Sequence, residues 1–67
     1  MSVARVTEIT ASSTTSFDDA VKVGVDRATK TLKNVEGAWV QDMTVKVDNG
    51  QVVEYRVNMK VTFILAD

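Results

Sequence analysis

The dipeptide Asn49-Gly50, which lies between two long runs rich in β-branched residues, constrains the fold of this chain more than any other feature. Asn-Gly favours the type I′ turn of a two-residue hairpin, because both central residues of that turn need positive φ angles. We therefore predict that residues 35–47 and 52–65 are the two arms of one hairpin. If the arms pair without a bulge, the numbers of two opposed residues add up to 99.

This register predicts the composition of the hairpin face that bears Trp39, the only tryptophan. The predicted pairs on it are Gly37–Thr62, Trp39–Lys60, Gln41–Asn58 and Met43–Arg56. Further apolar residues are predicted on the same face, namely Val45, Val47, Val52 and Ile64. Contiguous apolar patches on a surface usually mark a binding or subunit interface. We therefore expect Trp39 to face a partner chain, a ligand, or both.

The opposite face of the hairpin carries an almost unbroken apolar stripe, formed by Ala38, Val40, Tyr55, Val57, Met59, Val61 and Phe63. A helix that can cover this stripe is predicted after the hydroxyl-rich segment ASSTTS. Its N-cap is Ser13 or Ser16, and its end lies near Lys33 or Asn34. At 100° per residue its apolar residues fall in one arc, but Val23 interrupts the polar side. A second subunit contact is one hypothesis for Val23.

The overall order of elements predicts an α+β fold. Residues 2–10 alternate in polarity and are predicted to form a first strand, which gives the order β-α-β-β. A right-handed crossover from this strand, with the last strand inserted between the other two, gives an all-antiparallel sheet of order 1-3-2. We expect residues 1–67 to form one domain, in which a three-stranded sheet packs on one helix.

The composition limits what can stabilise so small a domain and what it can do. The chain has 67 residues, no Cys and no His, so disulfides, thiolate ligands and imidazole chemistry are absent. Domains of this size commonly need disulfides, metal or partner subunits, and oligomerisation is the remaining means. Without the usual base for a Ser or Thr nucleophile, and with no phosphate loop, we do not expect an enzyme.

Charge and hydropathy bear on partners and location. The net charge is −1, so the chain lacks the basic field that dominates affinity for nucleic acid. No apolar run approaches the roughly 20 residues that a membrane span needs, and residues 1–5 do not have the layout of a secretory signal. We therefore expect a cytoplasmic protein with no nucleic-acid or membrane partner.

Several short segments together resemble the dodecin family over nearly the whole chain. They are Ser16-Phe17 at the helix start, Ala28-Thr29-Lys30-Thr31-Leu32 running into Asn34-Val35, the long hairpin, and the closing Tyr55-Arg56-Val57 and Val61-Thr62-Phe63. Dodecins are small β-α-β-β proteins that assemble into hollow dodecamers of cubic symmetry. Many bind riboflavin or its phosphates in pairs between tryptophans, and are thought to store or sequester them. The resemblance implies a homododecamer with flavin at subunit interfaces.

Both flavin-recognition residues of the family are changed in this sequence. The stacking tryptophan of flavin-binding dodecins falls at Gly37, and the glutamine that hydrogen-bonds the flavin ring falls at Arg56. In one interpretation Trp39, two residues along the same face, takes over the stacking of FMN or riboflavin. Gly37, Gln41, Arg56 and Asn58 then complete the cofactor site, and Arg56 suits the phosphate of FMN.

In the other interpretation the flavin site has been lost. The chain then resembles the dodecins that lack the tryptophan, some of which bind calcium while others have no known ligand. Carboxylates for a cation are present at Glu36, Asp42, Asp48 and Glu54, but no EF-hand-like spacing links them. This interpretation makes the protein a calcium-binding dodecin or a structural shell, and it assigns no metal-ligating residue.

Overall fold

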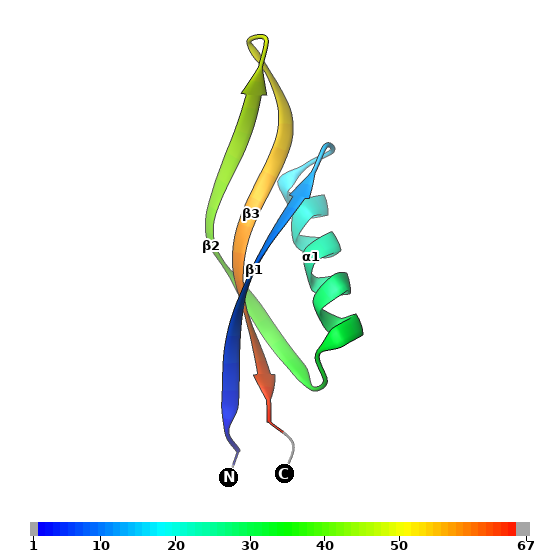
Figure 1. Cartoon of the computed structure of the whole chain (residues 1–67), viewed down its shortest axis with the longest axis vertical. Coiled ribbons are helices and arrows are strands. Elements are labelled where there is room, and N and C mark those ends of the chain that lie inside the picture. Colours follow the sequence, from blue (N-terminus) through cyan, green and yellow to red (C-terminus); the bar gives the residue numbers. More distant parts are fainter. Residues whose placement is uncertain (1, 66–67) are drawn as a thin grey trace.

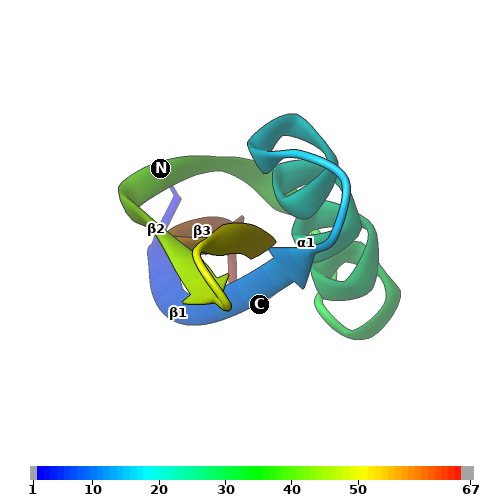
Figure 2. The ribbon, with the colours of Figure 1, turned by 90° about the horizontal axis from the view of Figure 1, so that it is seen from above.

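The computed structural model describes residues 2–65 and confirms the predicted fold. The elements are β1 (Ala4–Ser13), α1 (Phe17–Thr31), β2 (Val35–Asp48) and β3 (Gln51–Ile64). They form a three-stranded antiparallel sheet of order β1-β3-β2 with α1 on one side of it (Figures 1 and 2). The molecule is long and thin, with extents of 51 × 19 × 13 Å.

Two serines start the helix. The Ser16 hydroxyl accepts a hydrogen bond from the Asp19 backbone N–H at 3.0 Å, which makes Ser16 the N-cap. The buried Ser13 hydroxyl donates to Asp19 Oδ2 at 2.6 Å and accepts from the backbone N–H of Thr15 at 2.9 Å. Of the two predicted caps, Ser16 is therefore confirmed, while Ser13 orders the turn that precedes it.

Several element boundaries differ from the predictions, and the largest differences are at the ends of the first strand and of the helix. The first strand runs to Ser13 rather than to residue 10, because Ala11, Ser12 and Ser13 pair with β3. The helix ends at Thr31 with Leu32 as its C-cap, short of the predicted end near Lys33 or Asn34. Asn34 has a φ angle of 60°, and this left-handed residue turns the chain into β2.

The core lies between α1 and the central strand. Ala20, Val57 and Met59 are completely buried, and Ile9 and Phe17 pack against them. The Phe17 and Tyr55 rings meet edge to face with centroids 5.1 Å apart. α1 packs mainly on β1 and β3 and much less on β2. The predicted apolar stripe therefore meets the helix along β3, while β2 is left largely open.

The predicted register is confirmed beside the turn and at Trp39 and Gly37, but it shifts again between Gly37 and Val35, which pairs with Phe63. Asn49 and Gly50 have φ angles of 56° and 76°, as a type I′ turn requires. Near the other end, Trp39 pairs with Lys60 and Gly37 with Thr62. The register departs from the prediction in the middle because two shifts intervene, one between Lys46 and Val47 and one between Val40 and Asp42.

Two predicted pairs are therefore wrong. Asn58 pairs with Asp42 rather than with Gln41, and Met43 pairs with Val57 rather than with Arg56. One shift adds an extra residue to β3 at Val53 and the other adds an extra residue to β2 at Gln41, so that the two offset each other.

The shifts move apolar residues to the other face of the sheet. Met43 pairs with the buried Val57 and Val45 pairs with Tyr55, and directly opposed residues share a face. The prediction that Met43 and Val45 lie beside Trp39 is therefore wrong. Both are on the side of the sheet that bears α1, where they are 56% and 44% exposed.

Candidate functional site

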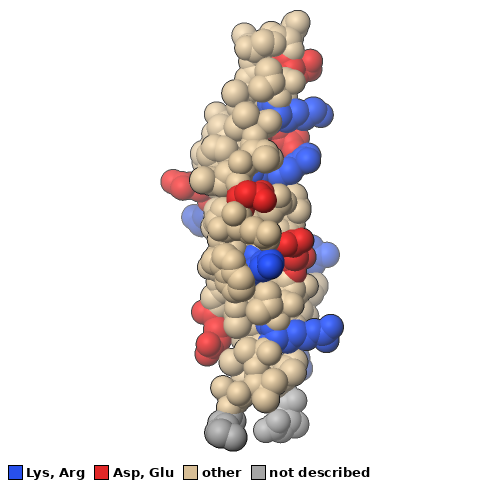
Figure 3. Space-filling model, turned by 90° about the vertical axis from the view of Figure 1, so that its left-hand side faces the viewer, with Lys and Arg blue, Asp and Glu red and all other residues tan. Residues whose placement is uncertain are grey.

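The outer face of the sheet, by which we mean the side away from α1, is built from cross-strand rows. In the order β1–β3–β2 these rows are Val6–Thr62–Gly37, Glu8–Lys60–Trp39, Thr10–Asn58–Asp42 and Ser12–Arg56–Thr44. Most members are polar, and charges of both signs are interspersed along this side of the molecule (Figure 3). Within these rows the charges are therefore of mixed sign, and the one aromatic ring is that of Trp39.

Trp39 stands on an open part of this face. Trp39 and its partner Lys60 point away from the core, because the adjacent pair Val40–Met59 is the one that points toward it. The Trp39 side chain is 49% exposed. A Cβ atom added at Gly37, two residues before Trp39 on the same face, would meet nothing within 4 Å. The backbone beside the indole is therefore accessible to a flat ligand.

The row next to Trp39 is fixed by side-chain hydrogen bonds. Thr10 Oγ1 donates to Asn58 Oδ1 at 2.7 Å, and Asn58 Nδ2 donates to the Asp42 carboxylate. These bonds link all three strands and orient the amide of Asn58. Asp42 occupies the place in this row that the sequence assigned to Gln41, which lies at the bulge and has no partner in the ladder.

Arg56 is held by neighbours and lies at a distance from the indole. Its Nη2 donates to Glu54 Oε1 at 3.1 Å, and its Nε donates to Ser12 Oγ at 3.4 Å. The Ser12 hydroxyl, followed by the Arg56 guanidinium, lowers the pKa of Glu54 below its ordinary value. Arg56 and Lys60 are four positions apart on β3, which is about 14 Å at about 3.4 Å per residue.

The structure thus brings together only part of the predicted cofactor site. Gly37 and Trp39 are neighbours, Asn58 is one row away, and Arg56 is two rows away. Lys60 pairs with Trp39 across the strands, so it is the cation in the same row as the indole. The register predicted from the sequence already paired Lys60 with Trp39. The family resemblance, however, indicated Arg56 as the cofactor-binding cation.

Two further findings concern metals and membranes. Within residues 2–65, no group of three or more His, Cys, Asp or Glu side chains is placed to hold a metal ion. In the same residues, α1 is too short and too polar to cross a bilayer.

Comparisons with known proteins agree with one another. The family model described as Dodecin matches residues 3–66. A dodecin from Streptomyces davaonensis is 33% identical, with a TM-score of 0.94 over 98% of this chain and 97% of that one. An arginine-to-alanine mutant of the Thermus thermophilus dodecin is 25% identical, with a TM-score of 0.94 over the full length of both chains.

A third structure is of interest for its ligand. It is the calcium dodecin of Mycobacterium tuberculosis, described as a calcium-chelating antigen with a novel calcium-binding site. It is 28% identical, with a TM-score of 0.84 over 96% of this chain and 91% of that one. Among curated proteins, no sequence matches the chain.

Proposed function

The chain belongs to the dodecin family, and we propose that it assembles into a homododecamer that stores or sequesters a flavin, FMN or riboflavin, against Trp39. The observation that supports this most is the half-exposed indole on the outer face beside the bare backbone of Gly37. A flat indole stacks on an isoalloxazine ring, with a free energy of about 1–3 kcal/mol per ring by analogy with aromatic–base stacking.

The residues around the indole give the proposed site its polarity. The glycine at position 37 leaves room for the ring beside Trp39, in place of the tryptophan that flavin-binding dodecins have there. Lys60 supplies a positive charge in the row of Trp39, and it suits the phosphate of FMN. Asn58, oriented by Thr10 and Asp42, supplies an amide in the next row. We therefore propose that FMN binds more tightly than riboflavin.

Assembly belongs to the same proposal. One chain offers an indole to one side of a flavin ring, so a second copy must cover the other side if the ring is to be withdrawn from water. The paired arrangement of flavins between tryptophans in other dodecins fits this requirement. The role is binding rather than catalysis, because the chain has no His and no Cys to activate a substrate, and the cytoplasm is the proposed location.

A flavin titration tests the proposal. FMN added to apoprotein is expected to lose fluorescence, and Trp39→Ala is expected to weaken binding about 5- to 150-fold, which corresponds to the loss of about 1–3 kcal/mol. Trp39→Phe keeps a stacking ring and should retain part of the affinity. Lys22→Ala, on the exposed side of α1, is the matched control. Unchanged FMN fluorescence at micromolar wild-type protein contradicts the proposal.

Calcium binding by a flavin-free shell is the second candidate, and the calcium dodecin of M. tuberculosis favours it. Calcium takes six to eight oxygen ligands. On one outer face, Asp42 and the Glu54 bonded to Arg56 lie in different rows, so a site needs carboxylates from several copies. If this candidate is right, calcium raises the thermal midpoint and a chelator reverses the rise, with Trp39→Ala having no effect on either.

A further inference from the structure

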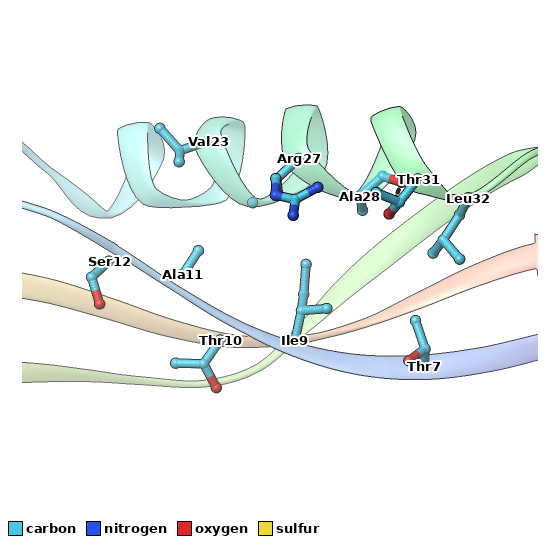
Figure 4. Close-up of a pocket in the computed structure, with 11 residues that line it drawn as sticks. Thr7, Ile9, Thr10, Ala11, Ser12, Val23, Arg27, Ala28, Thr31 and Leu32 are labelled. Carbon is cyan, nitrogen blue, oxygen red and sulfur yellow. Dashed lines mark hydrogen bonds between the residues drawn. The ribbon is translucent and has the colours of Figure 1, made fainter.

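The hairpin extends beyond the elements that support it. β1 ends at the pair Ser13–Tyr55, so residues 46–54, which we call the hairpin tip, form a ribbon of only two strands. The helix packs on another part of the sheet, where Ile9 and Ala11 of β1 point toward α1 (Figure 4). The tip projects past the ends of both β1 and α1 (Figure 1). Two-stranded hairpins without further packing are only marginally stable in water.

The hairpin tip is also exposed along its length. All residues from 46 to 53 are exposed, and Glu54 is half-buried. A register shift between Lys46 and Val47 interrupts the ladder within the tip. Segments with few buried contacts and an exposed backbone open with free energies well below that of global unfolding. Local opening of the tip therefore does not require the core around Met59 to unfold.

Asn49 differs from the other two asparagines of the chain in two respects. Asn34 and Asn58 are each followed by a bulky residue that shields the next backbone nitrogen, whereas Asn49 is followed by Gly50, which has no side chain. The side-chain amides of Asn34 and Asn58 donate hydrogen bonds. Within residues 2–65, no hydrogen bond holds the side-chain amide of Asn49. Its amide is therefore both unshielded and free to move.

An asparagine in this setting can react with its own backbone. The backbone nitrogen of Gly50 attacks Cγ of Asn49 and forms a new C–N bond, while the side-chain nitrogen leaves as ammonia and takes the proton of the Gly50 N–H. The product is a five-membered succinimide ring. One water molecule then opens the ring at either carbonyl, which gives aspartate or isoaspartate at position 49. The two steps together consume one water and release one ammonia, so they need no enzyme, oxidant or cofactor.

The geometry of the closed turn opposes ring closure. Asn49 has a φ angle of 56°, and the first central residue of a type I′ turn has a ψ angle of about 30°, the mirror image of type I. At this ψ angle the Gly50 nitrogen lies nearly opposite Cβ across the Cα–C bond of Asn49. The nitrogen reaches Cγ only after a large rotation about that bond, which breaks the turn. The closed tip therefore protects Asn49, and the opened tip does not.

We propose that Asn49 is a site of spontaneous deamidation in the folded protein and that opening of the hairpin tip sets its rate. The aspartate product keeps the turn, because Asp-Gly favours type I′ as Asn-Gly does. It adds a negative charge beside Asp48 to a chain whose net charge is −1. In the isoaspartate product the backbone runs through the side-chain carbon. The turn is then one atom longer, and the closing pair Asp48–Gln51 is lost. The reaction uses neither the flavin nor the assembly.

Peptide mapping by mass spectrometry tests the proposal. Folded protein and protein unfolded in guanidinium chloride are incubated at the same pH and temperature, and the peptide that contains Asn49 is followed. It should become acidic in both samples, but at least about tenfold more slowly in the folded one, which corresponds to an opening free energy of at least about 1.4 kcal/mol. Equal rates overturn the protection by the turn. An unreacted folded protein, after the unfolded chain has reacted fully, overturns deamidation in the folded state.

Isoelectric focusing with a matched control assigns the reaction to Asn49. Asn49→Gly removes the side-chain amide, and Gly-Gly also suits a type I′ turn. Aged wild-type protein should show a second, more acidic band at the position of Asn49→Asp, whereas aged Asn49→Gly should keep one band. An acidic band of equal strength in Asn49→Gly overturns the assignment, as does equally fast conversion of the peptides that contain Asn34 or Asn58.

A variant with a weaker tip tests what sets the rate. Val52 pairs with Val47 next to the turn, so Val52→Ala weakens the tip and should speed the conversion of Asn49 in the folded protein. Val6→Ala removes a similarly exposed valine near the other end of the sheet and should leave the rate unchanged. A rate that is the same in Val52→Ala, Val6→Ala and the wild type overturns opening of the tip as the controlling step.

Discussion

Replacing Gly24 by alanine sets two effects of similar size against each other. In the middle of a helix, alanine is favoured over glycine by about 1 kcal/mol. At this position, however, the new Cβ overlaps Met59 Cε and lies 3.0 Å from Ala11 Cβ. Met59 is completely buried, so its methyl group has to move inside a closed core, and overpacking typically costs about 1–3 kcal/mol. We expect Gly24→Ala to lower the free energy of unfolding by about 1 kcal/mol.

Urea denaturation at one fixed protein concentration measures this change, since self-association makes the midpoint depend on concentration. Gly37→Ala is the matched control, because its Cβ meets nothing within 4 Å and alanine is favoured in a strand by about 0.5–1 kcal/mol. Met59→Val removes the overlapping atom, so the double variant with Gly24→Ala should be more stable than the sum of the two changes predicts. Stabilisation by Gly24→Ala of the same size as by Gly37→Ala would refute the close packing inferred here.

Two further predictions concern the hairpin turn and the outer face. Gly50→Ala places a side chain at a φ angle of 76° and should cost about 1–2 kcal/mol in the same urea assay, whereas an unchanged midpoint contradicts the need for glycine in this turn. The pKa of Glu54 is lowered on folding, so its contribution to stability is complete above the unfolded pKa and is lost as the pH falls through the lower folded value. Ser12→Ala should raise the pKa of Glu54 in an NMR titration of its carboxyl group and weaken this loss of stability in acid, and an unshifted titration rejects the role of the hydroxyl.

Much of the fold could be read from the sequence because local and global signals agreed. The Asn49-Gly50 turn, the capping serine and the apolar arc of the helix all pointed to the same arrangement. The face of Trp39 was predicted correctly for a less direct reason. The two register shifts offset each other, so the pairing that holds at the turn is restored at Trp39–Lys60.

The middle of the hairpin was predicted wrongly because a bulge adds a residue without a compositional mark. Gln41 and Val53 are ordinary strand residues, and neither of them is next to a glycine that would indicate a bulge. The sequence does hold one signal. Apolar positions recur every second residue at Ala38 and Val40, but the next one, Met43, follows after three. That change of phase places Asp42, rather than Gln41, on the outer face, and it moves Met43 and Val45 to the side that bears α1.

The proposed ligand site could be predicted at Gly37, Trp39 and Lys60, but not in the neighbouring row that contains Asn58. Trp39 and Gly37 are two residues apart, so alternation alone places them together. The hydrogen bonds that orient Asn58 come from Thr10 on β1 and from Asp42 across the bulge. Neither partner follows from the hairpin register, because one needs the pairing of β1 with β3 and the other needs the bulge.

The order β1-β3-β2 also bears on how the chain reaches its native state. β2 and β3 are joined by a two-residue turn, and hairpins of this kind form within about 1–10 μs. β1 pairs only with β3, from Ser13 with Tyr55 to Ala4 with Ile64, so each of these contacts closes a loop that spans most of the polypeptide. On the ribosome the first strand emerges long before its partner does. We therefore expect β1 to dock after the β2–β3 hairpin has formed, which during synthesis requires β3 to have left the exit tunnel.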